Sequence, residues 1–133
     1  MRMKILLDTC AFIWAVSEPD RLSVKARDAL VAKDAMIYYS PITCAEIACL
    51  CERGRLVLNG HWKTWFDHYS EENGWSSVDI NLPIIQDAFA LPGSFHADPA
   101  DRIIVGTARC RDMYLITADR KLLDYPFVKT IGS

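Results

Sequence analysis

Four carboxylates in this chain have the spacing that metal-dependent hydrolysis requires. They are Asp8, Glu46, Asp101 and Asp119. A carboxylate at the end of a buried strand, as expected for Asp8, is costly to desolvate unless something pairs with it. Carboxylates that converge on one spot also raise each other's pKa values, and a bound divalent cation relieves that repulsion. Oxygen ligands suit Mg²⁺ or Mn²⁺, and such ions can polarise a phosphodiester and activate an attacking water. The four acids together therefore favour a hydrolytic nuclease.

Most of these acids also have a purely structural interpretation. Glu46 completes a T-x-x-E capping box with Thr43. Asp98, a fifth acid, is a good N-cap before Pro99, and Asp101 then takes a helix position where an acid favours the dipole. Asp119 can likewise cap the short helix that follows it. Capping and catalysis are compatible, because a cap position can aim a carboxylate at a cleft.

The elements that must position these acids alternate along the chain. Apolar periodicity predicts strands at residues 3–8, 35–39, 75–80, 114–117 and 127–131. It predicts helices at residues 10–16, 23–32, 43–53, 61–72, 83–91, 99–111 and 119–123. This order implies an α/β fold: a three-layer α/β/α sandwich with a central parallel sheet of about five strands, in one domain over 1–133. Sites in such sheets form at the carboxyl ends of strands, where the acids are expected.

Composition narrows the class of protein further. The chain has 133 residues, of which 51% are hydrophobic and 24% charged, as in a globular domain. The formal net charge of −2 argues against a broad basic surface for nucleic acid. No apolar run is long enough to span a bilayer, and the amino terminus does not look like a signal peptide, so we expect a cytoplasmic protein without a membrane partner. The five cysteines form no CxxC, and we expect buried free thiols.

Four segments resemble the PIN-domain family and, within it, the VapC-type toxins. They are LLDTCAFIW at 6–14, SPITCAEIACLCERGRL at 40–56, HADPADRIIVGTA at 96–108 and LITAD at 115–119. The resemblance runs over nearly the whole chain, and the combination is specific although no single segment is. It implies a PIN-like five-stranded parallel sheet with an acidic pocket that uses Mg²⁺ or Mn²⁺. It also implies an RNA substrate, a cognate antitoxin protein as partner, and a homodimer.

The resemblance assigns roles to individual residues. The four family acids fall on Asp8, Glu46, Asp101 and Asp119, and the auxiliary acid on Asp98. Family hydroxyls that orient a carboxylate or a metal-bound water fall on Thr9, Ser40 and Thr117. Cys10 and Cys44 depart from the residues usual in the family, and we expect them to affect only pocket shape. We expect Asp8, Glu46 and Asp101 to hold the main ion, and Asp119 with Asp98 to orient a second ion or a water. The products would carry a 5′ phosphate and a 3′ hydroxyl.

Other residues are candidates for contact with substrate or partner. Arg102 and Arg120 adjoin the acids and are candidates for binding substrate phosphates. The tryptophans could stack on RNA bases or anchor a partner, but Trp62 and Trp65 have the spacing of a packed helix face. His96 is a candidate for the edge of the cleft.

The favoured function is thus a metal-dependent endoribonuclease toxin of a toxin–antitoxin pair. Two alternatives stay open: a PIN nuclease of RNA processing, and a non-catalytic binding module on a PIN fold. A receiver domain would need an acidic pair after the first strand, and a haloacid-dehalogenase-type phosphatase would need D-x-D, where this chain has Cys10 at the second acid position.

Overall fold

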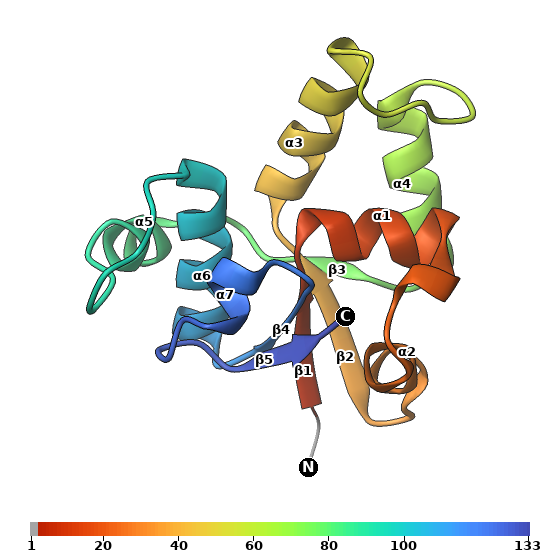
Figure 1. Ribbon diagram of the computed structural model, residues 1–133. Coiled ribbons are helices and arrows are strands. Elements are labelled where there is room, and N and C mark those ends of the chain that lie inside the picture. The colour runs from red at the N-terminus through yellow and green to blue at the C-terminus, as the bar shows by residue number, and fades with distance from the viewer. Residues whose placement is uncertain (1–2) are drawn as a thin grey trace.

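The computed structural model describes residues 3–133 and contains a five-stranded parallel sheet (Figure 1). The strands are β1 (Met3–Leu7), β2 (Ala35–Tyr39), β3 (Ser76–Ser77), β4 (Tyr114–Thr117) and β5 (Thr130–Gly132). Their order across the sheet is β3-β2-β1-β4-β5, and every pairing is parallel. Because β1 lies at the centre, the chain winds outward on both sides of it. The expected α/β fold with a parallel sheet of five strands is confirmed.

Helices cover both faces of this sheet (Figure 1). They are α1 (Thr9–Ser17), the short 3₁₀ helix η1 (Pro19–Arg21), α2 (Val24–Val31), α3 (Pro41–Glu52), α4 (Trp62–Glu72), α5 (Leu82–Ala88), α6 (Pro99–Arg111) and α7 (Arg120–Leu123). None of the helices within residues 3–133 has the length and apolar character needed to cross a bilayer.

Alternation along β1 divides the core into two clusters. Ile5 and Leu7 face the cluster that contains α1 and α4, whereas Leu6 faces the cluster built by α5, α6 and α7. All three side chains are fully buried, as a central parallel strand requires. The carboxyl end of this strand therefore has little freedom to move.

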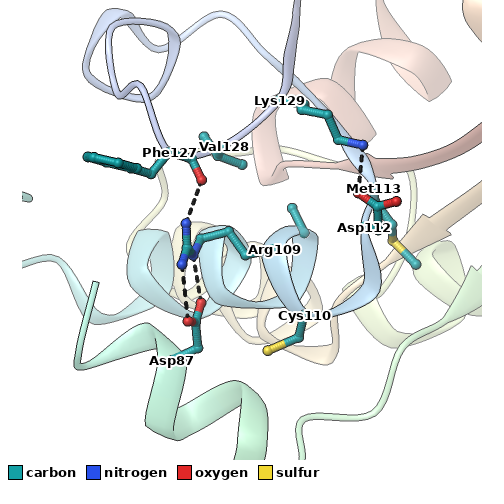
Figure 2. A pocket seen from close by; sticks show the side chains of 9 residues that line it. Asp87, Arg109, Cys110, Asp112, Met113, Phe127, Val128 and Lys129 are labelled. Carbon is teal, nitrogen blue, oxygen red and sulfur yellow. Dashed lines mark hydrogen bonds and ion pairs between the residues drawn. The ribbon is translucent and has the colours of Figure 1, made fainter. Parts of the chain in front are cut away.

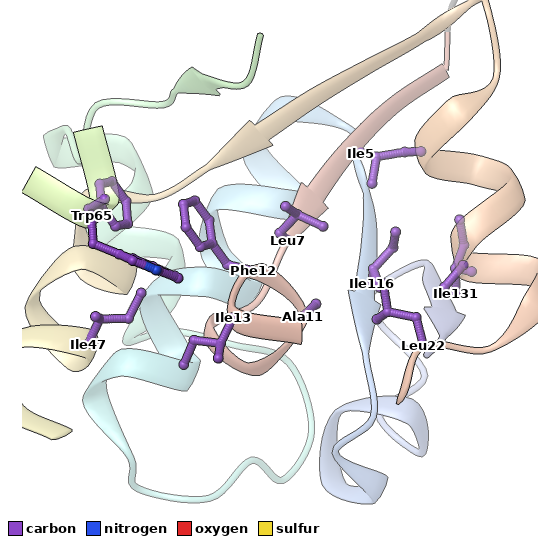
Figure 3. Packing of buried hydrophobic residues seen from close by; sticks show 12 residues of the cluster. Ile5, Leu7, Ala11, Phe12, Ile13, Leu22, Ile47, Trp65, Ile116 and Ile131 are labelled. Atoms are coloured by element: carbon purple, nitrogen blue, oxygen red, sulfur yellow. The ribbon is translucent and has the colours of Figure 1, made fainter. Parts of the chain in front are cut away.

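Phe12 of α1 is the centre of the first cluster (Figure 3). Its ring stacks on that of Phe66 with centroids 4.6 Å apart and meets the edges of Tyr39 and Trp75 at 5.6 and 5.0 Å. Aromatic pairs in such geometries add to the stabilisation from burial. This packing fixes α1 against the sheet, and so fixes the residues at its amino terminus.

On the other face, α6 packs closely against α5 at Gly106. A Cβ at this position would lie 2.9 Å from the carbonyl oxygen of Ile84 and 3.1 Å from the Cβ of Ala88. Only glycine permits that approach of the two helices. The contact fixes the position of α6, whose first turn carries Asp101.

Several predicted boundaries were wrong, and each has a local reason. The third strand is limited to Ser76–Ser77 rather than 75–80, because it is an edge strand that pairs only with β2. α3 begins at Pro41 rather than 43, since Ser40 caps it through the amide of Ile42. The last strand covers Thr130–Gly132 rather than 127–131. The remaining elements lie within about three residues of their predicted ends.

Candidate active site

The four predicted carboxylates meet at one edge of the sheet. Asp8 directly follows β1, Asp119 follows β4, and the amino-terminal halves of α3 and α6 supply Glu46 and Asp101. Together they line a pocket of ≈ 430 Å³. The other lining residues are Thr9, Cys10, Trp14, Leu50 and Ala118. The expected convergence of the acids at the carboxyl ends of the strands is what the structure shows.

Asp8 is the most buried of these acids, with 7% of its surface exposed. Its Oδ1 accepts a 2.8 Å hydrogen bond from the amide of Ala11, so the side chain also caps α1. The Thr117 hydroxyl donates a second hydrogen bond to the carboxylate. Burial, with smaller contributions from the nearby charges of Asp101 and Asp119, nevertheless raises the pKa of Asp8 to about 6.

Glu46 is held by a neighbouring hydroxyl. The Thr9 hydroxyl donates to its Oε1, and Thr9 also lies 3.4 Å from the Thr43 hydroxyl oxygen. Burial raises the pKa of Glu46, with contributions from the charges of Asp101 and Asp98. The capping-box interpretation of Glu46 was wrong, because Thr43 lies inside α3 and Ser40 is the cap.

Asp101 has a histidine as its partner. The Nε2 atom of His96 lies 2.7 Å from Oδ2 of Asp101, and the imidazole stacks on Phe95 at a centroid distance of 4.4 Å. Burial raises the pKa of Asp101, as do the charges of Asp98 and Asp119, while the hydrogen bond from His96 opposes the shift. His96 thus contacts a pocket carboxylate but is not among the residues that line the pocket.

Asp119 and Asp98 are exposed acids at helix amino termini. Asp119 accepts from the amide of Lys121 and caps α7, and Asp98 accepts from the amide of Ala100 and caps α6. Both capping predictions are confirmed. Asp98 is not among the residues lining the pocket, but its charge acts on Glu46 and Asp101.

Helix dipoles moderate the negative charge of the pocket. The amino termini of α1, α3 and α6 all lie at this edge of the sheet. Each presents a partial positive charge equivalent to about half a proton. These partial charges stabilise carboxylates nearby but fall short of neutralising four of them. The pKa values of Asp8, Glu46 and Asp101 are all raised, first by burial and then by the charges of neighbouring acids.

The donor set fits a hard divalent cation bound largely through water. Within residues 3–133, no three His, Cys, Asp or Glu side chains stand close enough together to hold a metal ion as they are. Glu46 is turned toward Thr9 and Asp101 toward His96. Mg²⁺ typically keeps several waters and binds through one or two carboxylates, so such an ion does not need three of these side chains to meet.

The structure gives the expected accessory residues different roles. Thr9 and Thr117 bind pocket carboxylates, and the Thr117 hydroxyl also accepts from the amide of Asp119. Ser40 is fully buried, and its hydroxyl accepts from the amide of Ile42 as a helix cap. Arg120 stays open to solvent, with 82% of its side chain exposed.

Arg102 requires a correction. It was a candidate for binding a substrate phosphate, but its guanidinium donates three hydrogen bonds, of 3.0–3.1 Å, to backbone oxygens of His96, Ala88 and Phe95. All three of its nitrogens therefore bind the end of α5 and the segment that leads into α6. By holding the backbone of His96, Arg102 acts on the pocket indirectly.

The cysteines also differ from expectation. All five are free thiols as predicted, but Cys10, Cys49 and Cys110 are exposed and the other two are half-buried. Cys10 lines the carboxylate pocket, where burial and the charges of Asp8 and Glu46 raise its pKa.

Sequence reasoning missed Leu50 as a pocket residue. The available signal was helical spacing, because Leu50 follows Glu46 by four residues and so lies on the same helix face. Trp14 follows Cys10 by the same interval and also lines the pocket. The prediction that Trp65 is a packing residue is confirmed, since it is buried in the first core cluster.

A second pocket lies at the carboxyl end of α6 and holds its charges in pairs (Figure 2). Arg109 donates from Nε to Asp87 at 2.9 Å and from Nη1 to the carbonyl of Phe127 at 2.7 Å. Lys129 lies 2.6 Å from Asp112 across the same pocket. Each acid here pairs with a lysine or an arginine, whereas neither residue type lines the pocket at the sheet edge.

The family model described as the PIN domain matches residues 5–128 of this chain. The chain belongs to the PIN-domain family. This PIN domain is 36% identical over 118 residues to ribonuclease VapC22 of Mycobacterium tuberculosis (strain ATCC 25618 / H37Rv). The aligned region covers 89% of this chain and 88% of that protein.

Solved structures show the same fold. A chain in the crystal structure of VapBC2 from Rickettsia felis, bound to a promoter DNA fragment, superposes with a TM-score of 0.70 at 15% identity, covering 98% of this chain and 99% of that one. A chain of a toxin–antitoxin complex from Klebsiella pneumoniae superposes with a TM-score of 0.65 at 20% identity, covering 96% of this chain and 95% of that one. At these identities the likeness concerns the fold of this PIN domain.

Proposed function

We propose that this protein is a VapC-type ribonuclease, the toxin of a toxin–antitoxin system. The observation that carries the proposal is the pocket in which Asp8, Glu46, Asp101 and Asp119 meet, with no lysine or arginine among the residues that line it. The 36% identity to ribonuclease VapC22 supports RNA as the substrate class.

The proposed roles follow from burial and contacts. When bound, Mg²⁺ or Mn²⁺ would polarise a phosphodiester and activate a water for attack. Asp8, Glu46 and Asp101 would hold that ion, directly or through water. Asp119, with Asp98 beside the pocket, would orient a second ion or an outer water. Thr9 and Thr117 would fix the carboxylates they contact. Arg120 is exposed and pairs loosely with Asp124 at 3.9 Å, and it would turn from that acid to contact a substrate phosphate.

The partner proposed for this chain is an antitoxin protein. Chains of similar fold come from a toxin–antitoxin complex and from VapBC2 bound to promoter DNA, which supports this pairing. A short neighbouring gene for a DNA-binding protein that co-purifies with this chain would support it further. Homodimer formation stays a prediction that light scattering of the purified protein can test.

The deciding experiment is cleavage of total bacterial RNA by purified, antitoxin-free protein. We expect discrete cuts with Mg²⁺ or Mn²⁺, none with chelator, and products with 5′ phosphates. Asp8→Asn and Asp101→Asn should each lower cleavage activity more than removal of an outer partner of a metal ligand does, which costs roughly 10- to 100-fold. Asp87→Asn is the matched control, because it removes the same charge at the second pocket.

Two results would overturn the proposal. Full metal-dependent cleavage by Asp8→Asn would remove the carboxylate pocket from the mechanism. No cleavage of any RNA by folded, metal-loaded protein would favour the binding-module alternative.

A further inference from the structure

The carboxylate pocket continues into an apolar half that hydrolysis does not use. On α1, Trp14 lies one helical turn beyond Cys10, and on α3, Leu50 lies one turn beyond Glu46. One turn of helix advances by about 5.4 Å. The two helices therefore present the same sequence of features: a polar or acidic side chain at the sheet edge, then a large apolar one further out.

Trp14 is held rigidly enough to act as a platform. Its ring is half-buried and packs against the first core cluster, while its remaining surface lines the pocket. A fixed aromatic face beside a strongly hydrophilic site is costly to leave in water. Its position points to a ligand with a flat apolar surface of its own.

Trp14 and Leu50 form the apolar wall of the pocket, and a cation, Arg21, lies over the Trp14 ring. The guanidinium carbon of Arg21 lies 4.3 Å from the centroid of the Trp14 ring, in a cation–π contact. Arg21 also pairs with Glu18 at 3.1 Å, and 56% of its side chain stays exposed. A guanidinium in this position can meet a phosphate while it supports the ring.

We propose that Trp14 and Leu50 form a subsite for one nucleobase of single-stranded RNA, next to the carboxylates, with Arg21 placed for a neighbouring phosphate. This rests on the proposed function, in which a phosphodiester enters the carboxylate half of the pocket. A nucleotide whose phosphate lies there carries its base toward the adjoining wall, one helical turn away.

The subsite selects single-stranded RNA on physical grounds. A base inside a duplex has both faces stacked, so it can meet the Trp14 ring only when it is splayed out of a helix. Stacking on an aromatic ring is tolerant of sequence, because every base has a π face. We therefore expect this wall to strengthen binding in loops and single strands without fixing which base is bound.

The test measures RNA binding in an Asp101→Asn background, so that it does not depend on cleavage. One probe is a single-stranded RNA oligonucleotide, and the other is a strand of equal length with abasic positions. We expect Trp14→Ala to weaken binding of the first about 5- to 150-fold and to leave binding of the abasic strand unchanged. Trp14→Phe should retain most of the affinity, and Leu50→Ala should lose part of it.

The matched control is Trp62→Ala, which removes a half-buried tryptophan on α4 outside this pocket. It should leave binding of both strands unchanged. Thermal unfolding of each variant separates loss of the subsite from loss of the fold. In cleavage by protein with Asp101 intact, Trp14→Ala should raise KM and leave kcat nearly unchanged.

Three outcomes would overturn the subsite. Equal loss for the RNA and the abasic strand would mean that Trp14 acts on the backbone or on pocket shape. Unchanged RNA binding by well-folded Trp14→Ala and Leu50→Ala would mean that no base stacks there. Unchanged RNA binding with weakened antitoxin binding would assign the wall to a protein segment. If the wild type fails to cleave RNA but the base-dependent loss is seen, the proposed function fails and the subsite stands.

Discussion

The two charged pockets of this protein are built on opposite principles. At the carboxyl end of α6, Asp87 has Arg109 at 2.9 Å and Asp112 has Lys129 at 2.6 Å. The contact with Lys129 holds the pKa of Asp112 below its ordinary value. At the sheet edge, burial instead raises the pKa of Asp8 to about 6.

Under the proposed function, this difference separates acids that hold the fold together from acids kept for chemistry. A paired carboxylate has satisfied its charge, so it has little to offer an incoming ion. An unpaired buried carboxylate costs stability, and that cost is recovered when a cation binds. Perturbed pKa values in a cleft are therefore a better guide to the active site here than the presence of charged residues.

The sharpest test of this contrast is the stability of Asp8→Asn without metal. The pKa of Asp8 is raised from an ordinary 3.8 to about 6, so the folded state loses stability as pH rises through that interval. Above about pH 6 the penalty is about 3 kcal/mol. Asparagine keeps the cap but carries no charge, so the variant should be more stable by up to that amount at pH 7.5.

Chemical denaturation at pH 4, 6 and 7.5, with chelator, measures this difference. The gain should shrink as pH falls and nearly vanish near pH 4. Addition of Mn²⁺ should stabilise the unmodified protein more than Asp8→Asn. A variant less stable than the unmodified protein at pH 7.5 would show that Asp8 is already neutralised in the fold.

In the second pocket, where each acid pairs with a cation, removal of an acid should lower stability rather than raise it. Asp87→Asn leaves the half-buried guanidinium of Arg109 without its anion, and we expect a loss of about 1.5–3 kcal/mol in the free energy of unfolding. Metal-dependent cleavage should stay at the unmodified level when assayed below the unfolding transition. Loss of cleavage by a folded Asp87→Asn protein would break the distinction between the two pockets.

The smallest expected effect concerns His96, the hydrogen-bond partner of Asp101. His96→Ala should lower Mn²⁺ affinity about 10- to 100-fold, because an outer partner orients the carboxylate. His96→Gln places an amide nitrogen near the position of Nε2 and should restore most of that affinity. Calorimetric titration with Mn²⁺ measures the affinity of each variant. Equal affinity in both variants would remove the orienting role.

The fold was largely readable from the sequence because each buried strand carries its own pattern. The ends of β2 and β4 were predicted to the residue, since both run between well-defined turns. β3 was not, because Ser76 and Ser77 are exposed edge residues without an apolar signature. Its extent depends on pairing with β2, which no local pattern records.

The acids of the site were predictable as a set, whereas their partners were not. Residue type and position after a strand identified Asp8 and Asp119. The Thr9–Glu46 contact joins side chains 37 positions apart, and only the packing of α1 against α3 brings them together. The role of Arg102 was not predictable for a similar reason, because its backbone acceptors lie 6 to 14 positions away, at the end of α5 and in the irregular segment before α6.

Three of the acids at the sheet edge, Asp8, Asp98 and Asp119, also cap helices, and this bears on how such a gene would decay. Asparagine caps a helix about as well as aspartate. A single-nucleotide change converts an aspartate codon to an asparagine codon. Under the proposed function, alleles that still fold but have lost a carboxylate of the site are therefore one mutation away at Asp8 and at Asp119. Selection against an active toxin would be expected to leave asparagines here before it leaves truncated chains.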